Sequence, residues 1–129
     1  MVQSLNTKVD LVMEATAFLG IAQYGEVMIG DKGFEFYDAR NPQKFIQIPW
    51  DEVNYVTAAV VFGGKWIPRY SFQTKRDGTF SFSSKHPKKV LRAISNYIAP
   101  DHMVRSIGFF DVLKNAFRSI IHGKNSEKK

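Results

Sequence analysis

The sequence predicts an α+β fold in which a curled antiparallel sheet of about seven short strands is capped by a helix. Three observations lead to this prediction. Between Gly25 and Phe82, apolar and polar residues alternate with the period of two that is typical of half-buried strands. Beyond position 86 the apolar residues recur at helical spacing. Aromatic residues, which favour strands, make up 14% of the chain.

Length and composition indicate one ordinary globular domain. A chain of 129 residues can bury a core without metal or disulfide support. The absence of cysteine excludes disulfides, thiol catalysis and thiolate metal sites. The N-terminus does not resemble a signal peptide, and no apolar run is long enough to span a bilayer. We therefore expect a soluble, cytoplasmic protein.

The residues before Gly25 divide into two parts. Residues 1–8 are polar, and we expect them to fray. The composition of Val9–Leu19 suits either a helix or a strand. We favour a strand, because the elements that follow need an opening partner.

The next residues predict a hairpin and a third strand. Val27 and Ile29 alternate with polar positions before the glycine-containing turn at residues 30–33. Phe34 and Phe36 then alternate with Glu35 and Tyr37. The next strand has an inward face formed by Ile46, Ile48 and Trp50. Its proline, Pro49, indicates a strand end or a sheet edge.

The second half of the sheet follows the same pattern. We expect turns at Gly63–Gly64 and at residues 75–78. The predicted inward faces are Val56, Ala58, Val60 and Phe62, then Trp66, Pro68, Tyr70, Phe72 and Thr74, and finally Phe80 and Phe82. The capping helix is expected near residues 86–98, with Pro87 in its first turn and Pro100 beyond its end.

The last part of the chain predicts a separate amphipathic helix. Within 105–123, apolar residues fill about half of the helical circle, and 124–129 reads as a disordered tail. The net charge of the whole chain is +6, and residues 105–129 carry +4 of it, with six basic and two acidic side chains. We thus divide the chain into a domain at 1–104 and the helix at 105–123. The apolar face could pack on the domain's own core, a partner, a membrane interface or a second copy of the chain.

No group of residues predicts catalysis, a metal or a cofactor. His86, His102 and His122 lack the spacing of metal ligands. Asp51 and Glu52 are adjacent, so on a strand they would point to opposite faces. Gly63-Gly64-Lys65 lacks the full phosphate-loop pattern. Nucleic-acid binding is disfavoured by the nearly neutral body, and we expect a binding protein that is not an enzyme.

Five segments together carry a family resemblance: GDKGFEFYD, IQIPWDEVNYV, FGGKWIPRYSFQTK, PKKVLRAI and HMVRSIGFFDVLK. They resemble the ManO-like family, small PH-like or GRAM-like proteins encoded beside mannose-class sugar phosphotransferase systems. The resemblance implies a seven-stranded curled sheet with one capping helix. It also implies an accessory or regulatory role at a transporter that imports and phosphorylates mannose or glucose, without catalytic residues.

Our leading hypothesis is an accessory protein that binds the membrane subunits of such a transporter, with weak contact to anionic membrane at the inner face. The predicted partner-binding residues lie in the amphipathic helix and in one turn: Phe109, Phe110, Leu113, Lys114, Phe117, Arg118 and Ile121, with Gly63, Gly64 and Lys65. The alternative is a PH-type module that binds an anionic lipid or a small ligand. Its predicted cations are Lys65, Arg69, Lys75 and Arg76.

Overall fold

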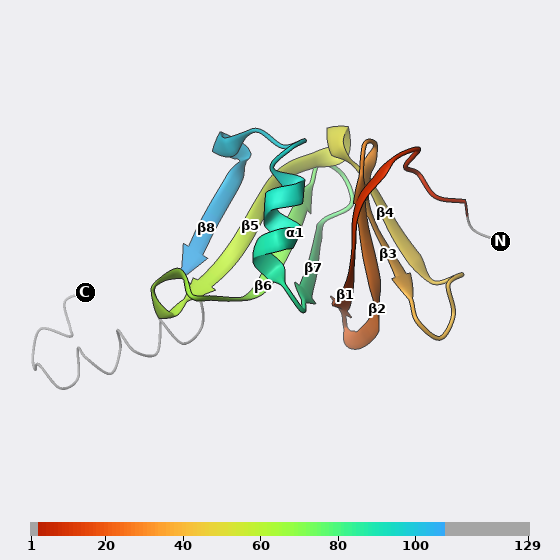
Figure 1. Ribbon diagram of the computed structural model, residues 1–129, viewed down its shortest axis with the longest axis horizontal. Helices are drawn as coiled ribbons and strands as arrows, with labels where there is room; N and C mark the ends of the chain where they lie inside the picture. The colour runs from red at the N-terminus through yellow and green to blue at the C-terminus, as the bar shows by residue number, and fades with distance from the viewer. Residues whose placement is uncertain (1–2, 108–129) are drawn as a thin grey trace, which may run out of the picture.

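Eight strands and one α-helix make up the part of the chain that the computed structural model describes, residues 3–107 (Figure 1). The strands are β1 (Val9–Leu19), β2 (Ile21–Gly30), β3 (Gly33–Asp38), β4 (Phe45–Pro49), β5 (Val53–Val61), β6 (Trp66–Thr74), β7 (Thr79–Ser84) and β8 (Met103–Ile107). The helix α1 spans Pro87–Ile94, and the connections contain three short 3-10 helices, η1 (Trp50–Glu52), η2 (Phe62–Gly64) and η3 (Pro100–His102). The predicted α+β class is confirmed. No helix in this part of the chain is long and apolar enough to cross a membrane.

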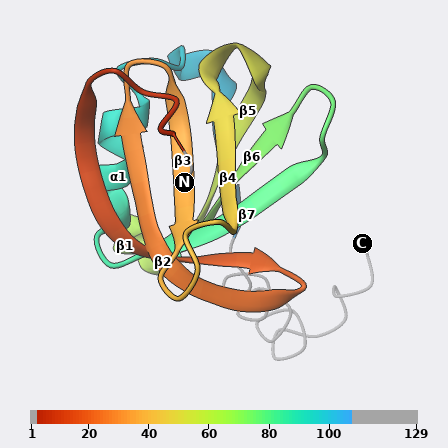
Figure 2. The ribbon, with the colours of Figure 1, turned by 90° about the vertical axis from the view of Figure 1, so that its right-hand side faces the viewer.

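The strands form one curled sheet in the order β4-β3-β2-β1-β7-β6-β5-β8. Its two halves join through a short ladder, in which β1 pairs with β7 only from Ala15↔Ser84 to Phe18↔Ser81. Figures 1 and 2 show the halves turned relative to each other. The helix α1 packs against β6, β1, β2 and β7 and so covers the opening that the curl leaves.

Aromatic side chains from both halves of the sheet fill the core. The ring centroid of Phe34 lies 4.3 Å from that of Phe72 and 4.8 Å from that of Phe82. From the other side, α1 contributes Val90 and Ile94, both fully buried. The core therefore joins the two halves of the sheet through packing where the backbone ladder between them is short.

Several predicted elements are confirmed. Residues Val9–Leu19 form a strand, and the chain turns into β2 at Gly20, whose φ of +90° suits glycine. The strand that ends at Pro49, β4, lies at the edge of the sheet, where a missing N–H is tolerated. The capping helix begins at Pro87 but ends at Ile94, earlier than predicted, and the residues up to 98 follow as turns.

The sheet has one strand more than the approximate number predicted. This strand, β8, runs parallel to β5, from Val56↔Met103 to Val60↔Ile107, so the sheet is not wholly antiparallel. Residues 105–107, where we expected the amphipathic helix to begin, belong to β8 instead. Pairing satisfies the open backbone groups along β5, which outweighs the helical periodicity of the sequence here. The boundary predicted after position 104 therefore falls within a strand, and residues 108–129 lie outside the described range.

A change of register explains a second difference. Phe62 and Trp66 were predicted to face inward, yet they are 54% and 45% exposed. Between the pairs Ala59↔Arg69 and Val61↔Trp66, β6 contains one residue more than β5. Such a bulge exchanges the two faces of β6, so Ile67 is buried in place of Trp66. Phe62 is exposed because β5 ends at Val61 and the chain turns there into η2.

The N-terminal residues are bound rather than frayed, which corrects the prediction for the described residues 3–8. Glu35, on the strand face predicted to be polar, is fully buried beneath them. Its carboxylate accepts hydrogen bonds from the Leu5 amide at 2.6 Å, the Ser4 hydroxyl at 2.7 Å and the Asn6 side-chain amide at 3.0 Å. Tyr37 and Gln47 donate two more, at 2.7 Å and 3.1 Å. We call residues 3–8 the N-terminal arm.

The arm also stabilises two carboxylates in their charged form. Burial by itself would raise the pKa of Glu35, but hydrogen bonds from Leu5, Ser4, Tyr37 and Asn6 hold that pKa below its usual value. Hydrogen bonds from Thr7 and Lys8 lower the pKa of Asp31 to about 2. Arm docking and the ionisation of these two groups are therefore linked.

Candidate functional site

The turn between β5 and β6 has an unusual backbone. Phe62, Gly63 and Gly64 have φ values of +52°, +65° and +93° in succession. Glycine adopts such values readily, whereas a phenylalanine with positive φ is strained. In the part of the chain that is described, Phe62 is the one residue other than glycine with positive φ. The turn predicted at Gly63–Gly64 is confirmed, and its first residue is held in a costly conformation.

This turn presents two aromatic side chains at the surface. The rings of Phe62 and Trp66 stack with centroids 6.1 Å apart and planes inclined by 13°. Phe62 and Trp66 are each about half exposed. Exposed aromatic side chains that lie together are typical of binding surfaces.

A groove rich in lysine runs beside the aromatic pair. One wall comes from the turn and the start of β6, and the other comes from the loop before α1 and its first turn. Its lining residues are Lys65, Trp66, Ile67, Lys85, His86, Pro87, Lys88 and Lys89, and its volume is about 390 Å³. We call it the basic groove. It contains four lysines and no acidic residue, and the N-terminus of α1 adds partial positive charge.

The described chain ends next to this turn. Because Ile107 pairs with Val60, β8 delivers the chain to a point two residues from Phe62. The Arg105 guanidinium reaches the turn as well, 3.8 Å from the position that a β-carbon on Gly64 would take. Of the predicted partner-binding residues, Gly63, Gly64 and Lys65 thus lie together, and the seven in 109–121 lie outside the described residues.

The four cations predicted for the alternative function do not converge. Lys65 lines the basic groove, but the Arg69 guanidinium lies over the Phe18 ring, 4.1 Å from its centroid. Arg76 pairs with Glu52 at 3.2 Å. Lys75 and Arg76 lie in the turn after β6, whereas Lys65 lies before that strand. Sequence reasoning missed Lys85, Lys88 and Lys89. They form a visible basic run, but only the topology places them opposite Lys65.

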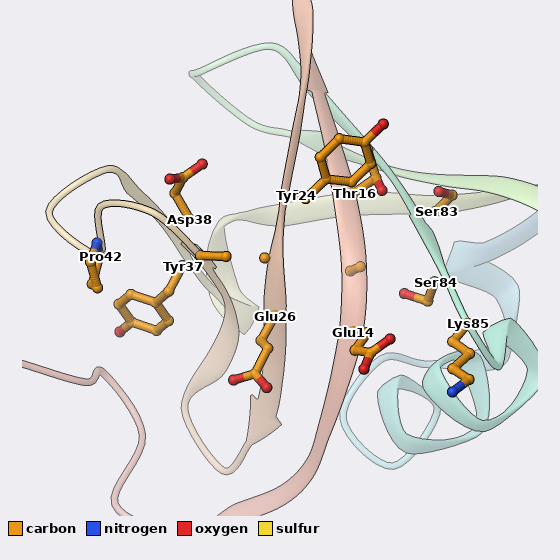
Figure 3. Close-up of a pocket in the computed structure, with 13 residues that line it drawn as sticks. Glu14, Thr16, Tyr24, Glu26, Tyr37, Asp38, Pro42, Ser83, Ser84 and Lys85 are labelled. Atoms are coloured by element: carbon orange, nitrogen blue, oxygen red, sulfur yellow. The ribbon is translucent and has the colours of Figure 1, made fainter.

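A second, larger groove of about 720 Å³ lies across β1, β2, β3 and β7 (Figure 3). Glu14 and Glu26 are paired residues on β1 and β2, and Figure 3 shows their side chains extending from neighbouring strands. Ser84, on another wall, shares a 2.6 Å hydrogen bond with the Tyr70 hydroxyl. No histidine lines this groove. Two exposed like charges and a hydroxyl bonded elsewhere do not form a nucleophile–base pair.

The described histidines have separate surroundings. His102 Nδ1 lies 2.7 Å from the carbonyl oxygen of Asn54, and its ring stacks on Tyr55. His86 stands at the N-terminal cap of α1. Within residues 3–107, no cluster of three or more His, Cys, Asp or Glu side chains could hold a metal ion. His122 lies outside the described range.

Comparison with known proteins gives a family and a fold. A family model described as a domain of unknown function, DUF956, matches residues 1–117. The crystal structure of the C-terminal domain of an unknown protein from Leishmania infantum has a similar fold, with a TM-score of 0.61. The similarity covers 70% of this chain and 83% of that chain at 10% identity, so it concerns the fold alone. No curated protein matches the chain.

Proposed function

The chain belongs to the DUF956 family, and from this premise we propose that it is a non-enzymatic accessory protein of a mannose-class sugar phosphotransferase system. In this proposal it works at the inner face of the membrane and binds the transporter's membrane subunits. It regulates sugar uptake by binding, without a cofactor or a chemical step of its own. We also propose that its curled sheet and single helix are of the PH-like type.

One observation supports the proposed docking surface above others. The parallel pairing of β8 with β5 brings Ile107 beside the end of β5, so the described chain ends next to the turn at Phe62–Gly64. The second predicted group begins at Phe109, two positions after Ile107 in the sequence. We propose that the turn and this group form one continuous docking surface.

The chemistry of the turn suits a protein partner. Phe62 and Trp66 present large, rigid apolar areas, which carry much of the binding energy in protein interfaces. Lys65 and Arg105 stand beside them as charged residues at the rim. Phe62 combines a positive φ of +52° with a side chain that is 54% exposed.

Co-purification tests this function. Tagged protein would be recovered from detergent-solubilised native membranes, and the bound membrane subunits would be identified by mass spectrometry. We expect the intact chain to retain the transporter subunits, and the variants Phe62→Ser/Trp66→Ser and Phe110→Asp/Phe117→Asp to lose them. Tyr24→Ser removes another aromatic residue, 70% exposed on β2, and serves as the matched control. Full retention by both double variants would refute the docking surface.

The alternative function remains a second candidate, a PH-type module that binds an anionic lipid or small ligand at the membrane surface. The basic groove favours it, because four lysines meet there without an acidic residue. The groove and the turn share Lys65 and Trp66, so the two candidate functions use overlapping surfaces. Vesicles without protein separate them.

A further inference from the structure

We propose that the basic groove binds the phosphate groups of anionic phospholipids, and that the Phe62–Trp66 pair enters the interfacial layer of the same bilayer. The inference rests on the second candidate function, and it names the ligand class and the residues. It replaces the scattered set of cations predicted from sequence with one assembled by the fold.

The groove gathers positive charge from two parts of the chain. Lys65 approaches from the turn before β6, while Lys85, Lys88 and Lys89 approach from the start of α1. All four are exposed, so their ammonium groups can reach a flat charged surface. Each basic side chain near an anionic membrane strengthens binding by about five-fold. Among residues 3–107, no carboxylate lines the groove to oppose this attraction.

The aromatic pair, Phe62 and Trp66, lies at the rim of the basic groove. Tryptophan prefers the boundary between headgroups and acyl chains, where its ring is apolar and its N–H stays hydrated. Trp66 is part of the groove wall and also stacks on Phe62. The rings and the lysines therefore belong to one continuous surface, as a contact with both layers of a lipid interface requires.

The shape of the basic groove suits a phosphate group at a bilayer surface. A volume of about 390 Å³ lies at the lower end of the range of roughly 300–1,000 Å³ for small-ligand sites. The groove is open along the surface rather than enclosed. It can therefore take a phosphate group that remains attached to a bilayer, which an enclosed cavity could not.

Flotation with vesicles tests the inference. The probes are vesicles of phosphatidylcholine alone and vesicles of phosphatidylcholine mixed with phosphatidylglycerol. We expect the protein to float with the mixed vesicles only. The variant Lys88→Gln/Lys89→Gln should weaken this binding by about 25-fold, which is the product of two five-fold effects.

A matched variant separates the groove from net charge. Lys44 and Lys75 are exposed lysines in other loops, and Lys44→Gln/Lys75→Gln removes the same two charges. We expect it to keep binding within about two-fold, because charges away from the contact are screened. Equal losses in both double variants, or no preference of the intact protein for mixed vesicles, would overturn the proposal.

Two further readouts identify the ligand source and the aromatic contact. Glycerol 3-phosphate and inorganic phosphate at millimolar concentration should not release the protein from mixed vesicles if a bilayer is the ligand. Complete release by either would overturn the bilayer as ligand and assign the groove to a free phosphate compound.

Tryptophan emission should shift to the blue when the protein binds mixed vesicles, and the shift should vanish in Trp66→Phe. A full shift in that variant would contradict insertion of Trp66 into the bilayer. Because these vesicles hold no transporter, failure here leaves the co-purification result intact, and the reverse also holds.

Discussion

Ile107 pairs with Val60 in the parallel ladder between β8 and β5, and this pairing ends the described chain beside the turn that contains three of the predicted docking residues. β5 ends one residue after Val60, and the strained turn begins at Phe62. A helix beginning at position 105 would have left this geometry undetermined. The strand places Ile107 beside this turn, and the proposed docking surface depends on that position.

The amphipathic segment can be tested for packing on its own domain. Next to β8 lies a hollow of about 220 Å³ whose lining includes Ile67, Leu91 and Met103. If the segment instead meets a partner, Phe110→Asp/Phe117→Asp should change the free energy of unfolding by less than about 0.5 kcal/mol, as for surface substitutions. Urea unfolding measures this value. A loss of about 3 kcal/mol or more would indicate two buried aromatic residues and contradict the docking role.

Glu35 should be a major determinant of stability. Glu35→Ala removes the acceptor of the Leu5 amide, the Ser4 hydroxyl and the Tyr37 hydroxyl. The side-chain amides of Asn6 and Gln47 each lose one hydrogen bond and keep those to the carbonyl oxygens of Gly33 and Gln3. We expect a loss of about 2–4 kcal/mol in urea unfolding, from several hydrogen bonds to one charged group. Glu26→Gln, at an exposed position, should stay within about 0.5 kcal/mol. Similar losses in both variants would contradict the role of the arm.

Docking of the N-terminal arm should weaken as the pH falls. The pKa of Asp31 is lowered from 3.8 to about 2 and that of Glu35 is lowered from 4.5, so the unfolded chain binds more protons in this range. Their contribution is present above about pH 4.5 and is lost as pH falls through the folded-state values. Hydrogen exchange of the Thr7 and Lys8 amides should accelerate, relative to their intrinsic rates, between pH 4 and pH 2. Asp31→Asn should remove most of this dependence; an unchanged profile would contradict the link.

Gly25 should tolerate no side chain. A β-carbon there would stand 2.0 Å from the carbonyl oxygen of Tyr37, a backbone atom in the paired strand β3. We expect Gly25→Ala to cost about 3 kcal/mol or more, because the strands must separate. Gly20→Ala meets no atom within 4 Å and bears only the strain of positive φ, about 1 kcal/mol. Thermal unfolding of both variants compares them, and the reverse order of stability would contradict the register of β2 and β3.

The hydroxyl of Tyr70 should stay protonated in strong base while the protein is folded. Its side chain is fully buried, and burial raises the pKa of the phenol despite the hydrogen bond to Ser84. Absorbance titration of Tyr70→Phe should match that of the parent until unfolding begins. The same variant should lose about 1 kcal/mol, and Ser84→Ala should add little to it, because both remove one hydrogen bond. Additive losses would contradict a single shared bond.

The sequence predicts the sheet well where a short turn connects two strands. Alternation located β2 and β3, and Pro49 correctly indicated an edge strand, because these signals depend on neighbours in the chain. The strand β8 was missed because its stability comes from a partner more than 40 positions away in the sequence, β5. Its own residues fit a helical period equally well.

The candidate site was predicted in part for the same reason. Gly63, Gly64 and Lys65 could be chosen from a local turn pattern. The exposure of Trp66 could not, since one additional residue in β6 reverses the inward face. The lysines at 85, 88 and 89 join Lys65 only through the packing of α1 against β6. Glu35 was assigned to a solvated face because the arm that buries it precedes it by about 30 residues.

In the proposed complex, the turn at Phe62 touches the transporter. The most direct measurement places a photo-crosslinking amino acid at position 62 and illuminates native membranes that contain the protein. We expect a covalent adduct with a membrane subunit of the mannose-class system, and none when the same amino acid replaces Tyr24. An absence of this adduct at position 62 in membranes that hold both proteins, or equal adducts at the two positions, would contradict contact between this turn and the transporter.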